Sequence, residues 1–198
     1  MASETLERKL YNAASKGDVT TLVHLLEEDP FLIHGVSFPC SRNLLHIAAM
    51  HGQTAIVEEL LKLSPRLARI SDSHNSSPLH LAVEEGHVEI SQKLLLVSPE
   101  ACWWRDNHDM NPVHIAAMKG HVDIMEHLLQ VSYLPAKERL RRRETVLHLC
   151  VKHDQLMALK VLVDKLGKDI VNAIDEDGET LLHFAVRCNQ FEVTINLL

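Results

Sequence analysis

The feature that most constrains this chain is a histidine that recurs at a nearly constant spacing. It is found at His46, His80, His114, His148 and His183, and the intervals are 34, 34, 34 and 35 residues. A catalytic residue or a metal ligand is normally needed once, whereas a residue that returns once per structural unit serves the unit itself. We therefore interpret these five histidines as structural.

The same short pattern surrounds each histidine. NPVHIAAMKGHVDIMEHLL, which starts at Asn111, is typical. A Ser, Thr or Asn precedes a short apolar stretch and can cap a helix there, and Pro78 and Pro112 suit the first helical position. Since a buried imidazole needs hydrogen-bond partners, we expect each ring to bond back to the cap and on to a neighbouring loop.

Small residues and a chain reversal follow the histidine. Gly52, Gly86 and Gly120 end the first stretch, and we expect positive φ there. Asp154 and Asn189 replace glycine in the last two copies, and both residue types tolerate this conformation better than most. A second amphipathic helix then follows. The small residues that would let adjacent helices approach closely are Ala48, Ala49, Ala82, Ala116, Ala117 and Ala185.

This pattern resembles the ankyrin repeat, with SPLHLA, NPVHIAA and TLLHFA as its most similar stretches. The resemblance implies an all-α fold, an ankyrin-repeat solenoid of stacked helix-turn-helix pairs with β-hairpin-like connecting loops. We expect one domain over residues 1–198, because a single helix pair cannot bury its apolar face. Its six copies are expected at about 6–38 (an N-terminal cap repeat), 39–72, 73–106, 107–140, 141–175 and 176–198 (a truncated sixth copy).

A narrower resemblance concerns one class of plant ankyrin proteins. LYNAASKGDVTTLVHLLEEDP and ETVLHLCVKHDQLMALKVLV are similar to the ankyrin domains of plant defence regulators that continue into a hydrophobic, membrane-spanning PGG-type domain. This similarity implies a role in immune or cell-death signalling. It also implies a cytoplasmic location, on the cytosolic face of a membrane where the full-length protein has such a domain.

Charge is unevenly distributed along the chain. The 20 Lys and Arg against 27 Asp and Glu give a net charge of −7, so we expect no nucleic-acid partner. Residues 137–143, KERLRRR, nevertheless hold five basic side chains and one acidic one. Two interpretations stay open: a solvated loop, or a site for an acidic segment, a phosphorylated ligand or an anionic membrane surface. The basic residues of the second interpretation are Lys137, Arg139, Arg141, Arg142 and Arg143.

The loop that contains this basic stretch is also unusual in its turn. Arg143 occupies the position that Gly178 holds in the next copy, so we expect this hairpin to depart from the geometry of the others.

Trp103 and Trp104 are the only tryptophans. In an extended segment they would point to opposite faces, and we expect at least one to pack between copies, although exposed tryptophan commonly anchors interfaces.

The ankyrin resemblance implies that partners bind the hairpin tips and the ends of the first helices. We therefore expect another protein as partner and a monomeric chain. Further tip and helix-end positions are Pro39, Cys40, Arg42, Met50, His51, Glu84, Glu85, Glu176, Asp177, Glu179, Arg187 and Cys188. The candidate partner-binding residues are Trp103, Trp104, Ser73, His74, Ser76, Asn107, His108, Met110, Arg141, Arg142, Glu144, Met118, Lys119, Lys152 and His153.

An enzyme or a ligand-gated sensor built on the array is the competing hypothesis. It would need a unique cluster of titratable groups in a pocket, and the sequence has no GxSxG, P-loop, kinase or HExxH motif. We therefore expect no catalysis, no cofactor and no metal. Among the four cysteines, we expect Cys150 and Cys188 to be inert packing residues, with Cys40 and Cys188 the ones that exposure would make oxidisable.

Overall fold

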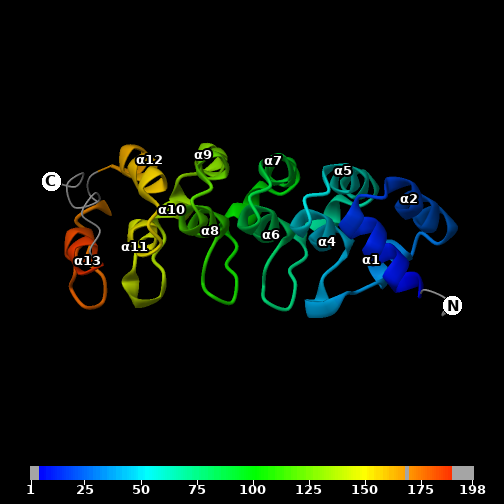
Figure 1. Cartoon of the computed structure of the whole chain (residues 1–198), viewed down its shortest axis with the longest axis horizontal. Helices are drawn as coiled ribbons and strands as arrows, with labels where there is room; N and C mark the ends of the chain where they lie inside the picture. The colour runs from blue at the N-terminus through cyan, green and yellow to red at the C-terminus, as the bar shows by residue number, and fades with distance from the viewer. Residues whose placement is uncertain (1–4, 168–169, 189–198) are drawn as a thin grey trace. The chain divides into compact units, whose positions relative to one another are not determined.

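The computed structural model describes residues 5–167 and 170–188. The chain divides into two compact units, Met1–Ala101 and Cys102–Leu198, which we describe separately (Figure 1). Within the described ranges the chain is helical and contains no strand; Phe38 and Arg42 form an isolated antiparallel bridge. The predicted all-α fold is confirmed. None of the described helices is long and apolar enough to cross a membrane.

In the first unit, three copies each contribute an inner and an outer helix. Each inner helix packs against the inner helix of the next copy, and the outer helices form a second row (Figure 1). The connections contain α3 (Leu32–Gly35), η1 (Pro39–Ser41) and η2 (Pro65–Arg69). The inner helices are α1 (Leu6–Lys16), α4 (Leu44–Met50) and α6 (Pro78–Glu84), and the outer helices are α2 (Val19–Glu28), α5 (Thr54–Leu63) and α7 (Val88–Val97).

The second unit repeats this arrangement. Its inner helices α8, α11 and α13 lie side by side, as do the outer helices α9 and α12 (Figure 1). Asn189, at the reversal predicted for the sixth copy, and the second helix predicted to follow it lie outside the described residues. The elements are η3 (Pro99–Trp103), α8 (Pro112–Lys119), α9 (Val122–Val131), α10 (Leu134–Lys137), η4 (Arg141–Arg143), α11 (Val146–Lys152), α12 (Leu156–Leu166) and α13 (Leu181–Arg187).

The recurring histidine closes a reciprocal cap at the start of each inner helix that carries it. At α8, the side chain of Asn111 accepts the backbone N–H of His114 at 3.1 Å, and His114 Nδ1 accepts the backbone N–H of Asn111 at 3.2 Å. Histidine thus takes the place that Glu or Gln holds in the usual capping box. The same box is present at α4, α6, α11 and α13, which confirms the predicted caps.

The onward hydrogen bond of the histidine is clearest at His46, whose Nε2 lies 3.1 Å from the backbone oxygen of Ser76 in the next tip. The Nε2 atoms of His114 and His148 are also buried, and the backbone of Glu138 acts on the first ring and that of Glu179 on the second, without the short, well-aligned bond seen at His46. His183 keeps its contact with the Thr180 hydroxyl, at 2.8 Å, but is exposed. Burial lowers the pKa of His46 and of His114 to about 4, since it disfavours the charged ring.

Close packing and tight reversals follow as predicted. The predicted small residues are buried in both units. Gly52, Gly86 and Gly120 have φ values of 72°, 81° and 74°, and Asp154 has 59°. A Cβ at Gly120 would collide with the side-chain amide of Gln155, which belongs to the next copy. Glycine is therefore required there by both backbone conformation and space.

Replacing Gly120 should destabilise the second unit. We expect Gly120→Ala to lower the free energy of unfolding by about 1–2 kcal/mol, because alanine is strained in the left-handed region and must displace Gln155. Gly35→Ala is the matched control, since nothing lies within 4 Å of its added Cβ and its φ is not in that region. Urea unfolding followed by circular dichroism measures both. Equal stabilities for the two variants would contradict this account.

The buried histidines should make stability pH-dependent. In the unfolded chain a histidine titrates near pH 6.5, whereas in the folded chain the pKa of His114 is about 4. Stability from the neutral ring of His114 is therefore complete above pH 6.5 and is lost as pH falls towards 4, on the order of 3 kcal/mol. His114→Gln, which can still cap but does not titrate, should show a shallower loss in urea titrations across this range.

His108→Gln serves as the control for this measurement, because His108 is exposed on a hairpin tip. It should retain the wild-type dependence on pH. If His114→Gln lost stability between pH 6.5 and 4 as steeply as the wild type does, burial of this ring would not be the source of the acid sensitivity.

Candidate protein-interaction surface

Three of the hairpin tips are built on an aspartate. Asp106 Oδ1 accepts the backbone N–H groups of His108 and Met110, both at 2.9 Å, and the backbone of Asp106 donates to the Met110 oxygen at 3.0 Å. Asp72 and Asp175 make the equivalent bonds in their own tips. The carboxylate therefore fixes the backbone of the tip and leaves the side chains between its contacts free to vary.

The tip at residues 141–143 departs from this geometry, as predicted. Leu140 stands where those three tips have aspartate, so no carboxylate holds the loop. Two consecutive residues, Arg142 and Arg143, adopt φ values of 59° and 57°, which is the pattern of a type I′ turn. Cys40 and Ser41, in the corresponding tip of the second copy, adopt the same pattern with φ values of 64° and 58°.

Two arginines of the second unit connect neighbouring tips through hydrogen bonds and ion pairs. Arg105 donates to the backbone oxygens of Asp109 and Arg139 and forms ion pairs with Asp109 at 2.9 Å and Glu138 at 2.6 Å. Arg139, one repeat later, donates to the oxygens of Arg143 and Ile174. The role of Arg105 was not predicted, although its 34-residue offset from Arg139 was a usable signal. These contacts make adjacent tips one connected surface.

Several basic side chains of residues 137–143 already interact with other groups of the chain. Arg142 forms an ion pair with Asp177 at 2.5 Å and lies 3.7 Å from Glu176, so neighbouring carboxylates balance its charge. Arg141 donates to the Asn107 oxygen at 3.0 Å, a contact that holds the guanidinium without neutralising it. Lys137 Nζ lies 5.0 Å from the centre of the Tyr133 ring. Of the five basic residues, Arg142 thus has the least charge to offer a ligand.

The predicted tip and helix-end residues face solvent to different degrees. Each of these positions lies on a loop tip or at the end of an inner helix, while the caps and alanines beneath them are buried. The exposed ones are Ser73, His74, Asn107, His108, Arg141, Arg142, Lys119, Lys152 and His153, and the half-buried ones are Ser76, Met110, Glu144 and Met118.

The tryptophan pair lies at the end of η3. Trp103 closes this 3₁₀ helix and is 39% exposed, while Trp104 is half-buried. The extended conformation assumed for both residues is wrong for Trp103. Both indoles are thus partly exposed, and neither is fully buried in the core.

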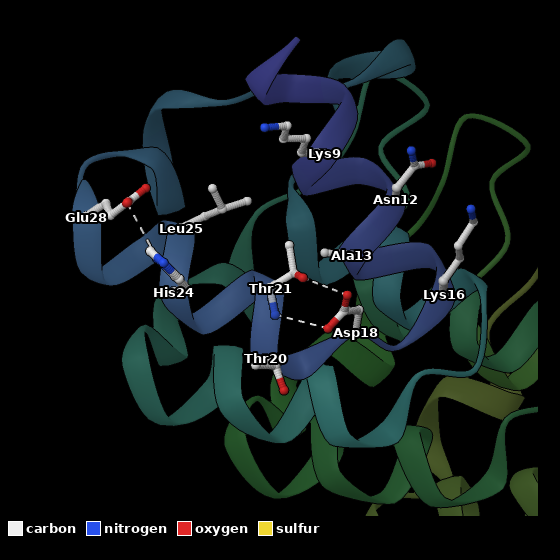
Figure 2. A pocket seen from close by; sticks show the side chains of 10 residues that line it. All are labelled: Lys9, Asn12, Ala13, Lys16, Asp18, Thr20, Thr21, His24, Leu25 and Glu28. Carbon is white, nitrogen blue, oxygen red and sulfur yellow. Dashed lines mark hydrogen bonds and ion pairs between the residues drawn. The ribbon is translucent and has the colours of Figure 1, made fainter. Parts of the chain in front are cut away.

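A hollow of about 680 Å³ lies beside α1 and α2 in the first copy (Figure 2). Its acids already have structural roles: Asp18 caps α2 by accepting from Thr21, at 3.0 Å from the backbone and 2.6 Å from the hydroxyl, and Glu28 lies 3.6 Å from His24. Hydrogen bonding to Thr21 also holds the pKa of Asp18 below its usual value. The arrangement resembles a solvated helix surface more than the convergent acid-base set that catalysis needs.

The cysteines divide into two buried and two exposed. Cys102 and Cys150 are buried, and burial raises the pKa of the Cys150 thiol to about 12, so this sulfur is a packing group at neutral pH. Cys40 and Cys188 are exposed. The packing role expected for Cys188 is wrong, because this residue follows the last turn of α13, where the helix meets solvent. In the described part of the chain, no three His, Cys, Asp or Glu residues converge as a metal site would require.

Comparison with known proteins agrees with this geometry. A family model described as ankyrin repeats (3 copies) matches residues 10–103, 68–138, 93–173 and 113–198, which together span nearly the whole chain. A comparison with curated proteins finds no significant match. Ankyrin repeats generally mediate binding to other proteins and are typically non-catalytic. The repeated caps, the paired helices and the aspartate-based tips have the same explanation: the chain belongs to the ankyrin-repeat family.

Proposed function

We propose that this chain is a non-catalytic scaffold that binds another protein through its tips and inner-helix ends. The observation that carries the proposal is the contrast between frame and tips. The frame residues that recur are buried in the second to fifth copies, whereas residues that differ at one equivalent position, such as Ser73, Asn107 and Arg141, are exposed on the tips. A rigid frame with variable exposed side chains suits recognition of one partner.

We further propose a role in plant immune or cell-death signalling. The support is the resemblance of the repeats, including LYNAASKGDVTTLVHLLEEDP, to plant ankyrin-transmembrane defence regulators. In this proposal the repeats lie in the cytoplasm, as the cytosolic part of a membrane-anchored protein, and act without a cofactor.

Removing tip side chains should abolish partner recovery. We expect His74→Ala/His108→Ala/Arg141→Ala to lose proteins that the wild-type chain recovers from plant cell extract, because a few exposed residues carry most of the energy of an interface. The measurement is affinity purification followed by mass spectrometry. Circular dichroism checks first that the variant is folded.

The matched control places three substitutions on the outer helices, at exposed residues away from the tips: Glu27→Ala/Lys160→Ala/Lys165→Ala. It should recover the same proteins as the wild type. If the tip variant recovered them equally well, the tips would not be the binding surface. If the wild type recovered nothing beyond the background of an unrelated bait, the scaffold function would fail.

A second candidate function is attachment to an anionic membrane surface through Lys137, Arg139, Arg141, Arg142 and Arg143. The favouring observation is that Tyr133 and Leu134, just before this stretch, are 50% and 47% exposed. Aromatic and apolar side chains beside basic ones suit the membrane interface.

This candidate predicts co-sedimentation with phosphatidylserine-containing vesicles, and not with phosphatidylcholine vesicles, at low salt. Binding should weaken at high salt, since screening reduces surface attraction. Lys137→Glu/Arg143→Glu should lower the bound fraction, because each basic residue near such a surface contributes about 1 kcal/mol. Equal sedimentation of variant and wild type would exclude this loop as the attachment site.

A further inference from the structure

The inner helices of the second unit all end with a basic residue, whereas those of the first unit end differently: α1 with Lys16, α4 with Met50 and α6 with an acid. In the third copy, within the first unit, α6 ends with Glu84 and is followed by Glu85. At the corresponding positions of the second unit stand Lys119, Lys152 and Arg187, each in the last turn of its helix. Cations there interact favourably with the helix dipole, but α6 forms with acids at the same place. Helix stability alone therefore does not require a row of basic residues.

The basic side chains of the second unit lie on neighbouring helices. α11 packs against α8 on one side and α13 on the other, so its end lies between theirs (Figure 1). Burial lowers the pKa of His153, and the positive charges of Lys152 and Lys119 lower it further. Two ammonium groups from adjacent helices thus act on the same ring, which indicates a local concentration of positive charge.

The carboxylates that pair with Lys152 and Arg187 are less exposed than these two cations. Lys152 Nζ is 3.7 Å from Glu144, and the two side chains are 50% and 15% exposed. Arg187 lies 2.6 Å from Glu179, with exposures of 52% and 31%. Because the cations are more exposed than the acids that pair with them, an approaching molecule contacts the ammonium and guanidinium groups first.

We propose that Lys119, Lys152 and Arg187, which we call the basic row, bind an acidic, extended segment of a partner protein. This proposal rests on the scaffold function above and specifies the chemistry of the partner. Charge complementarity is the argument for this occupant. Packed helices are spaced by roughly 8–10 Å, and an extended chain covers roughly 3.3–3.6 Å per residue. Asp or Glu at every third residue of the segment would therefore meet successive helix ends.

The test is selection of short random peptides, displayed on phage, against the full chain. Selected peptides should be enriched in Asp and Glu at a spacing of three. The tightest of them, labelled for fluorescence anisotropy, should bind Lys119→Glu/Lys152→Glu at least about tenfold more weakly than wild type, because like charges then face one another. Lys119→Gln/Lys152→Gln, which only neutralises, should weaken binding less. Thermal unfolding by circular dichroism verifies that each variant is folded.

Lys160→Glu/Lys165→Glu is the matched control. It changes the net charge equally but on α12, where both lysines are exposed, and its Kd should stay within about twofold of wild type. Peptides without an acidic excess, no selected peptide at all, or equal weakening by both double variants would overturn the basic row. Each of these results would leave the scaffold function intact, because that function fails only if the affinity purification recovers no partner.

Discussion

The reciprocal bond between a cap residue and the histidine three positions later is the interaction on which the rest of this fold depends. It satisfies donors at the start of a helix that is only two turns long and too short to be stable alone. It also buries the ring, as at His114, so that the loop before the helix and the helix itself are held as one piece. The tip that precedes each helix therefore starts from a fixed base.

Side chains that cross from one copy to the next extend this rigidity along each unit. Gln155 lies against the loop at Gly120, and Gln53 donates to the backbone oxygen of Ser15 at 3.0 Å. At the tips, the Glu176 backbone donates to the Arg142 oxygen at 2.9 Å, and Ser73 donates to Cys40 at 2.8 Å. Such contacts reduce the entropy that a tip would lose on binding, which is why exposed residues on these loops can serve recognition.

Much of the fold could be predicted because it follows from local rules that repeat. The cap, the first-turn proline and the reversal at Gly120 or Asp154 each depend on residues close in sequence, and repetition marks where each belongs. The site was less predictable because exposure and pairing depend on the neighbouring copy. The charge run at residues 137–143 did not reveal that Asp177 neutralises Arg142, and nothing in the sequence around Cys188 distinguished packing from exposure.

The constant frame also explains how one fold can present different surfaces in its different copies. The residues that hold a copy together are buried, so a change at a helix end such as Glu84 or Lys152 leaves them undisturbed. Each such exchange alters the charge presented at one position by up to two units. Specificity is a difference between affinities, so acids at one helix end, as on α6, and cations at others, as on α8 and α11, let the same architecture attract one kind of segment and repel another.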